Sequence, residues 1–207
     1  EELLLCANRN PTEEDWFSLP LGQAEGLDVL VEALDGESSL AVRLLDPLGQ
    51  PLLERDASPT LATTLVAREA GNHLLSLSAS RERDVPYRLE LLSLGCQDDG
   101  FEPNNERGAA TTVEHGAYEE LVLCLDDVDF YSLTLQPGQQ ASLRVSFDDG
   151  VADVDLQLKD EERAILAEST EDGESEAVDT PPIEEETTFI LKVFHGGEES
   201  QSVLYRL

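Results

Sequence analysis

The 207-residue sequence contains no methionine, only two lysines and no long uninterrupted apolar run. Its longest apolar stretches, such as residues 3–7, have the length of a strand, far short of the roughly 18 residues that a membrane-spanning helix needs. Only 13 basic residues stand against 45 acidic ones, which gives a formal net charge of −32. Because such a charge repels phosphate backbones and anionic lipid surfaces, the composition argues against nucleic-acid binding and membrane insertion.

Motifs of catalysis are also missing. The three histidines, His73, His115 and His195, have no Cys, Glu or His at metal-ligand spacing, so no zinc site is predicted. No Gly-x-Ser-x-Gly elbow, phosphate-binding loop or Gly-x-Gly-x-x-Gly segment occurs. With 45 acidic residues, the spacing of any carboxylate pair carries no information about glycosidase chemistry. We therefore predict that the protein is not an enzyme.

Alternation of apolar and polar residues dominates what is present. Residues 141–147 and 154–159 alternate without a break, and residues 27–33 do so with one exception. Turn signals such as Asp35-Gly36 and Pro137-Gly138 separate these segments at short intervals. A helical period is not sustained anywhere, and residues 105–113 allow a turn or two at most. The pattern predicts an all-β fold of short antiparallel strands.

An internal repeat divides the sequence into two. Asp15–Leu19 (DWFSL) matches Asp129–Leu133 (DFYSL) at an offset of 114 residues (129 − 15). Near the ends of the copies, Tyr87–Leu89 matches Tyr205–Leu207 at an offset of 118 (205 − 87). A common register with small changes in loop length predicts two consecutive β-sandwiches, residues 1–94 and 95–207. Residues 95–105 form a polar, turn-rich leader to the second copy, and the first copy has no equivalent.

The second copy carries several short motifs in a fixed order. They are Glu102-Pro103-Asn104-Asn105, Asp126-Asp127-Val128-Asp129-Phe130-Tyr131, Asp153-Val154-Asp155-Leu156 and the closing Leu204-Tyr205-Arg206-Leu207. This pattern resembles the bacterial pre-peptidase C-terminal (PPC) domain, and the resemblance covers residues 96–207. The first copy is similar from Asp15 onward but lacks the leader. The resemblance implies two antiparallel jelly-roll-like β-sandwiches from an exported, extracellular or cell-surface bacterial protein.

The resemblance also implies a metal site. It extends to the collagen-binding domains of clostridial collagenases, which hold calcium between the leader and the Asp-x-Asp segment. Carried over by position, the expected calcium ligands are Glu102, Asn104, Asn105, Asp126 and Asp129, with Asp127 as a further candidate. Calcium prefers six to eight oxygen ligands from flexible segments, and these residues supply them. Two interpretations stay open: these acidic and Asn side chains bind calcium, or they cap turns without any metal. In the first copy only Asp15 remains, and no complete site is predicted there.

The three cysteines fit the same scheme. Cys96 lies in the leader and Cys124 just before the Asp-rich turn, the two segments that calcium would join, so we predict a disulfide between them. Cys6 is the equivalent of Cys124 in the first copy, and its expected partner lies outside the chain. The alternative is three buried free thiols. Disulfides imply an oxidising compartment.

These features together predict a non-catalytic accessory, binding or spacer region of a larger secreted or cell-surface protein. The expected partners are an extracellular protein or polymer, or copies of the chain itself. One alternative is a structural subunit of an extracellular fibre or surface layer, bridged by calcium. Another is the accessory C-terminal region of a secreted peptidase.

Overall fold

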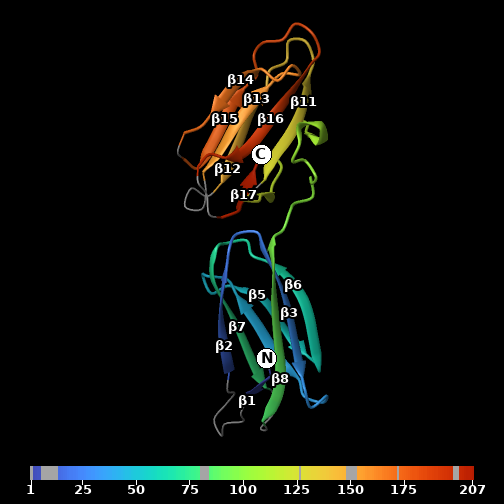
Figure 1. Ribbon diagram of the computed structural model, residues 1–207, viewed down its shortest axis with the longest axis vertical. Coiled ribbons are helices and arrows are strands. Elements are labelled where there is room, and N and C mark those ends of the chain that lie inside the picture. The colour runs from blue at the N-terminus through green and yellow to red at the C-terminus, as the bar shows by residue number, and fades with distance from the viewer. Residues whose placement is uncertain are drawn as a thin grey trace. The chain divides into compact units, whose positions relative to one another are not determined.

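The computed structural model describes residues 2–5, 14–79, 84–125, 127–147, 153–171, 173–197 and 201–207. The chain separates into two compact units, Glu1–Cys96 and Gln97–Leu207. Both are built mainly from antiparallel strands (Figure 1), which confirms the predicted all-β fold. In the described part of the chain the only helical element is a 3-10 turn, η1 (Arg107–Ala109), and no helix there is long and apolar enough to cross a membrane.

The first unit is a sandwich of two four-stranded sheets. One sheet has the order β1 (Glu2–Leu5), β8 (Val85–Cys96), β3 (Glu25–Ala33) and β6 (Thr60–Val66). The other has the order β2 (Glu14–Leu21), β7 (Gly71–Ala79), β4 (Leu40–Leu45) and β5 (Pro51–Ala57). Alternate side chains face inwards and are almost fully buried, among them Val31, Leu77 and Tyr87.

The second unit repeats this arrangement. One sheet has the order β10 (Leu121–Leu123), β17 (Val203–Arg206), β12 (Ser142–Phe147) and β15 (Ser175–Asp179). The other has the order β14 (Ile165–Ser169), β13 (Val154–Lys159), β16 (Thr187–His195), β11 (Val128–Leu135) and β9 (Thr111–Thr112). Apart from β9, each strand takes the place that its counterpart has in the first unit. Buried side chains such as Leu156, Leu191 and Val193 form a separate core.

Turn residues close the strands as their sequence signals indicate. Between β4 and β5, Asp46 Oδ1 accepts hydrogen bonds from the backbone N–H groups of Leu48 (2.9 Å) and Gln50 (2.6 Å). Gly49 follows with φ of +82°, a conformation that side chains with a Cβ rarely adopt. Local hydrogen bonding by an Asp side chain therefore sets this hairpin.

The end of the first unit differs from the predicted leader. Residues 95 and 96 were expected in the leader, but they complete β8, because Gly95 and Cys96 pair with Gly26 and Glu25 of β3. β8 therefore has 12 residues and spans the length of its sheet (Figure 1). The polar leader proper begins at Gln97, where the second unit begins.

Candidate metal centre and an apolar groove

The leader is held against the second sandwich by its own polar groups. Asp99 accepts hydrogen bonds from the N–H of Phe101 and from the N–H of Val122 in β10, both at 2.7 Å. The N–H of Phe130 in β11 donates to the carbonyl of Asn104 at 2.9 Å. These bonds place the leader across the starts of two strands.

An aromatic contact adds to this attachment. The ring of Phe101 stands edge-on to Tyr118 and to Tyr131, with centroid separations of 5.5 and 6.3 Å. Edge-to-face pairs of this kind stabilise by roughly 0.5–1.5 kcal/mol beyond the area they bury. The leader is thus part of the folded unit, and its acidic residues have defined positions.

Three carboxylates converge where the leader meets β11. Glu102 comes from the leader, Asp127 from the turn after β10, and Asp129 from β11 itself. One oxygen of each lies within 4.8 Å of the others. Asp129 is completely buried, whereas Glu102 and Asp127 are half-buried. None of the ion pairs formed among the described residues involves these three groups, so the cluster contains no side-chain cation.

Asn104 lies fully buried beside this cluster. Its backbone N–H donates to Glu102 Oε2 at 2.9 Å. One terminal atom of its side-chain amide lies 2.7 Å from Glu102 Oε1 and 3.2 Å from Asp129 Oδ1. With both carboxylates ionised and no cation bound, that atom is the nitrogen, because only N–H can donate to two carboxylate oxygens. A bound cation would favour the opposite orientation, with the amide oxygen turned towards the carboxylates.

Burial and mutual repulsion shift the acidity of the cluster. Burial is the main cause that raises the pKa of Asp129 to about 8; the Tyr205 hydroxyl opposes the shift, and Asp127 adds to it. Burial also raises the pKa values of Glu102 and Asp127, each partly offset by a backbone N–H. Groups whose charged form is disfavoured in this way gain most from a nearby cation, which removes the repulsion.

A pair of tyrosines fixes the orientation of Asp129. The hydroxyl of Tyr205 in β17 donates to Asp129 Oδ2, and the hydroxyls of Tyr205 and Tyr131 share a further hydrogen bond. Burial and the nearby Asp129 raise the pKa of both phenols, so they remain protonated. One oxygen of Asp129 is thereby committed to the protein, and the other faces Asn104.

The structure brings together Glu102, Asn104 and Asp129 from the predicted ligand set, and Asp127 joins them. Asn105 has an exposed side chain and takes no part in the contacts above. Asp126 lies outside the described residues, as does Cys6. Cys96 and Cys124 are disulfide-bonded.

Sequence reasoning did not foresee the roles of Asp99, Tyr131 and Tyr205. The one available signal was the repetition of a Tyr at the end of both copies, Tyr87 and Tyr205.

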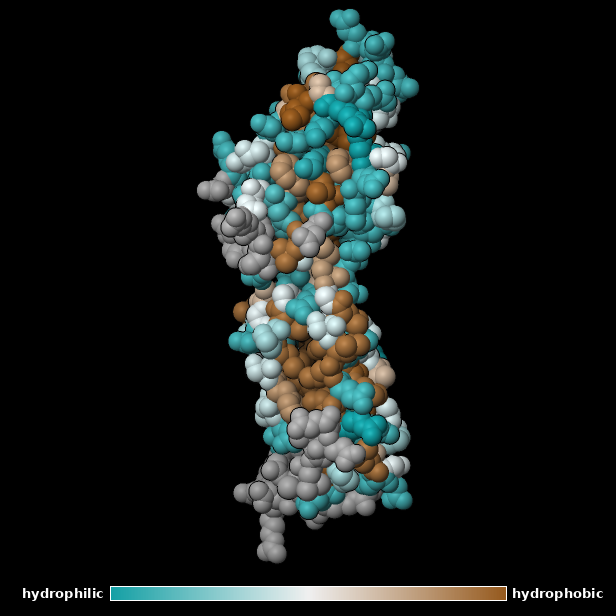
Figure 2. Space-filling view, viewed as in Figure 1, coloured by the Kyte–Doolittle hydropathy of each residue, from teal (hydrophilic) through white to brown (hydrophobic). Residues whose placement is uncertain are grey.

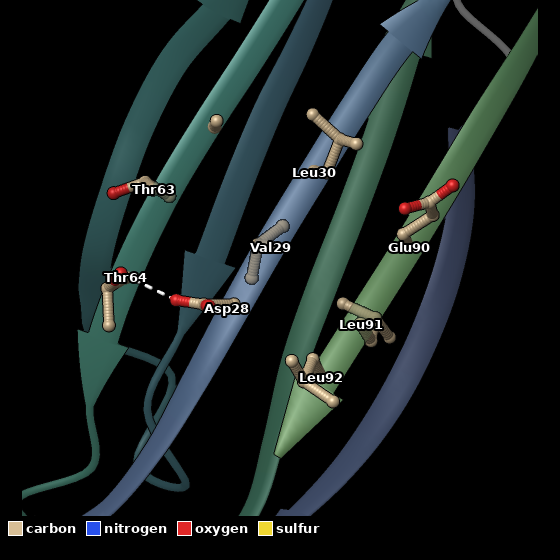
Figure 3. Close-up of a pocket in the computed structure, with 9 residues that line it drawn as sticks. Asp28, Val29, Leu30, Thr63, Thr64, Glu90, Leu91 and Leu92 are labelled. Carbon is tan, nitrogen blue, oxygen red and sulfur yellow. Dashed lines mark hydrogen bonds between the residues drawn. The ribbon is translucent and has the colours of Figure 1, made fainter. Parts of the chain in front are cut away.

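A second feature is an apolar groove of about 760 Å³ on the outer face of the first unit, across β3, β6 and β8 (Figure 3). Leu92 of β8 is 61% exposed and lines the groove, as does Glu90 of the same strand. On the opposite side Thr64 Oγ1 donates to Asp28 Oδ1 at 2.6 Å. Figure 2 shows apolar surface gathered on this face of the first unit. Apolar side chains that gather into one contiguous exposed patch can mark an interaction surface.

No family model and no curated protein matches the sequence. Among solved structures, the pre-peptidase C-terminal domain of a collagenase from Bacillus anthracis aligns with a TM-score of 0.37 and 14% identity, over 47% of this chain and 90% of that chain. Tripeptidyl peptidase 2 aligns with a TM-score of 0.33 and 11% identity, over 99% of this chain but only 22% of that chain. The tandem CBM22 modules of Paenibacillus barcinonensis Xyn10C align with a TM-score of 0.28 and 12% identity, over 95% and 90% of the two chains. At these values the likeness assigns neither a family nor an activity.

Proposed function

We propose that this protein is a non-catalytic accessory region of an exported bacterial protein, built from two PPC-like sandwiches, of which the second is stabilised by calcium. The observation that carries the proposal is the convergence of Glu102, Asp127 and Asp129 around the buried amide of Asn104. Three carboxylates and one amide oxygen match the hard oxygen donors that calcium prefers. The residue pattern supports the assignment to the PPC family; the structural likenesses above do not.

Calcium would act here as a structural tie. Its ligands would come from the leader (Glu102, Asn104), from the turn after β10 (Asp127) and from β11 (Asp129), so one ion would join three segments. Water completes the coordination of calcium where protein oxygens number fewer than six. A ligand that binds only the folded state stabilises it by mass action, by about 2.7 kcal/mol at 100 times its dissociation constant.

The groove of the first unit supplies the surface for a partner. Leu30 of β3 and Leu92 of β8 give it apolar surface, and Asp28 of β3 and Glu90 of β8 add negative charge. An extracellular protein or polymer that combines apolar and basic groups would complement it. Because the groove and the metal centre belong to different units, we expect calcium to support the fold of one unit and the groove to make contacts in the other.

Thermal unfolding under non-reducing conditions tests the metal centre. The midpoint of the second unit is expected to rise with 2 mM calcium relative to excess chelator, and the rise should vanish in a Glu102→Gln/Asp129→Asn double variant. Glu106→Gln is the matched control, because Glu106 is an exposed carboxylate directly after the leader and makes no side-chain capping hydrogen bond. A midpoint that ignores calcium in the wild-type chain would leave these residues as turn caps.

A further inference from the structure

The tripeptide Asp-Val-Asp occurs twice in the second unit, at residues 127–129 and 153–155. The two occurrences lie at the beginnings of β11 and β13, the strands that flank β16 in one sheet. The first belongs to the carboxylate cluster described above, through Asp127 and Asp129. The second lies outside that cluster and has no role in the proposed function.

A difference of one residue in register places the two tripeptides on opposite faces of this sheet. Asp129 pairs with Val193 of β16, which belongs to the core, whereas Asp155 pairs with the next residue, Phe194. Directly paired residues of neighbouring strands have their side chains on the same face, and successive residues of a strand alternate between faces. Asp129 therefore points into the sandwich, while Asp153 and Asp155 lie on the outer face of the sheet.

A glycine makes room for these two carboxylates. A Cβ atom on Gly196 would lie 2.5 Å from Asp153 Oδ2 and 2.7 Å from Asp155 Oδ1, closer than Cβ atoms come to other groups in proteins. The two oxygens therefore meet where the side chain of any other residue would stand. They are at most 5.2 Å apart, the sum of the two distances. Calcium binds oxygens at roughly 2.3–2.6 Å, so one ion can join two oxygens at such a separation.

One oxygen of Asp155 is buried without a hydrogen-bond partner. The residue is only 6% exposed, and among the described residues no group donates a hydrogen bond to Asp155 Oδ1. This oxygen is the one that lies over Gly196, on the side of Asp153 Oδ2. Because burying an ionised carboxylate oxygen without a partner costs free energy, its position indicates a ligand between the two side chains.

The charges around Asp155 are mostly negative, which indicates the sign of that ligand. Burial is the main cause that raises the pKa of Asp155 to about 6, and Asp153, Glu176 of β15 and Glu168 of β14 add to the shift. Lys192 of β16 opposes it. Asp155 takes part in none of the ion pairs formed among the described residues. A bound cation would relieve the repulsion between these carboxylates.

We propose that Asp153 and Asp155 form a second cation site, which binds one calcium ion over Gly196 on the outer face of the sheet. Carboxylate oxygens are donors that calcium prefers, and water completes its coordination where the protein supplies few of them. Gly196 is exposed and Asp153 is half-buried, so the ion reaches the pair from solvent. The site is separate from the centre at Asp129 and does not rest on the function proposed above.

The first unit lacks the residues for such a site. Its strand β4 corresponds to β13, and the offset of 114 residues between the two halves of the repeat aligns Ser39 with Asp153 and Ala41 with Asp155. Neither Ser39 nor Ala41 supplies a carboxylate. The second cation site is therefore a property of the second unit, and the first unit serves as an internal reference in its test.

A calcium titration followed by NMR of the backbone amides is the direct test. It uses the Glu102→Gln/Asp129→Asn chain, so that the other centre does not contribute and the failure of either site can be told apart. The amide signals of Asp155 and Gly196 are expected to shift saturably with one dissociation constant of about 0.1–1 mM, as in extracellular calcium-binding modules. The amide of Ala41 should not move. Signals of Asp155 and Gly196 that ignore calcium would overturn the proposal and leave the two carboxylates to share a proton.

Two matched pairs of variants separate this site from diffuse attraction of calcium to an acidic surface. Gly196→Ala keeps both carboxylates but forces their oxygens aside, so calcium should bind about tenfold more weakly or worse, whereas Gly116→Ala adds a Cβ in open space and should change nothing. Asp155→Asn should abolish the saturable shift, and Asp179→Asn, at an exposed position of β15, should leave it intact. The four variants are also made in the wild-type background, where the comparison does not depend on folding of the double variant. Equal calcium affinities within either pair would overturn the proposal.

Discussion

The two units share one buried interaction but differ in what surrounds it. In the first unit the hydroxyl of Tyr87 donates to Asp15 Oδ2 at 2.6 Å. In the second unit the equivalent Tyr205 donates to Asp129 Oδ2. Asp15 is half-exposed, whereas Asp129 is completely buried. The Asp–Tyr hydrogen bond therefore belongs to the sandwich framework, and in the second unit the leader and the turn after β10 place two further carboxylates, Glu102 and Asp127, beside it.

The aromatic residue two positions after each Asp shows the same difference. The first unit has Phe17 and the second has Tyr131, whose hydroxyl bonds to that of Tyr205. Trp16 is 47% exposed, while its counterpart Phe130 is half-buried and donates its N–H to the leader. A short polar segment thus changes burial and hydrogen bonding at positions that the repeat makes equivalent.

The largest expected difference between the units is in their response to pH. With chelator present, folded Asp129 keeps its proton up to its pKa of about 8, whereas the unfolded chain loses it near 3.8. Unfolding then releases a proton, so the stability of the second unit falls as pH rises from 5 to 8, by up to about 1.4 kcal/mol per pH unit. The raised pKa values of Glu102 and Asp127 act in the same direction.

Urea unfolding at constant ionic strength measures this slope. Trp16 is the only tryptophan and lies in β2, so its fluorescence follows the first unit, while circular dichroism follows both. The difference between the two signals isolates the second unit. Saturating calcium, which keeps the carboxylates ionised, should flatten the slope, and Asp129→Asn should reduce it. An Asp129→Asn chain with the full slope would assign the effect to other groups.

The sequence patterns predicted the fold more completely than the candidate metal centre. Alternation and the repeat predicted strands such as β12 and the core positions, because a one-residue slip would turn a strand's apolar side chains to water. The end of β8 was missed, because the pairing of Gly95 and Cys96 depends on Gly26 and Glu25 of a strand far earlier in the sequence, not on their own composition. A polar, glycine-containing segment gives no local sign of such pairing.

The site was foreseen only as far as adjacent residues allow. Glu102, Asn104 and Asp129 lie close together, but Asn105 is exposed, because the backbone bends at this residue before the 3-10 turn. The contribution of Asp127 depends on the path of the turn after Cys124. Tyr205 is 76 residues from Asp129 in sequence, and only the packing of the two sheets brings them together.

Loss of the disulfide is expected to have the next largest effect. Cys124→Ser opens the loop that the Cys96–Cys124 bond closes, which corresponds to about 3–4 kcal/mol in the chain-entropy model. The transition that circular dichroism assigns to the second unit should move to lower urea concentration. Trp16 fluorescence should show the first unit unchanged. Reduction of the wild-type chain with a phosphine should reproduce the shift. Cys96 ends β8 of the first unit, but the rest of the closed loop belongs to the second unit, so equal shifts of both signals would contradict an effect that acts mainly on the second unit.

The smallest expected effect comes from removing the Asp–Tyr hydrogen bond that the two units share. Tyr205→Phe removes one hydrogen-bond partner from the buried Asp129 and one from the Tyr131 hydroxyl, so we expect the second unit to lose about 1–3 kcal/mol of its free energy of unfolding. Tyr87→Phe removes the same bond from Asp15, which is accessible to water. We therefore expect the first unit to lose about 1 kcal/mol or less of its free energy of unfolding. Phe fills the same space as Tyr, so both changes test the hydroxyl alone. Similar losses in urea unfolding of the two units would mean that the leader does not seal Asp129 from solvent, and calcium would then have little buried repulsion to relieve.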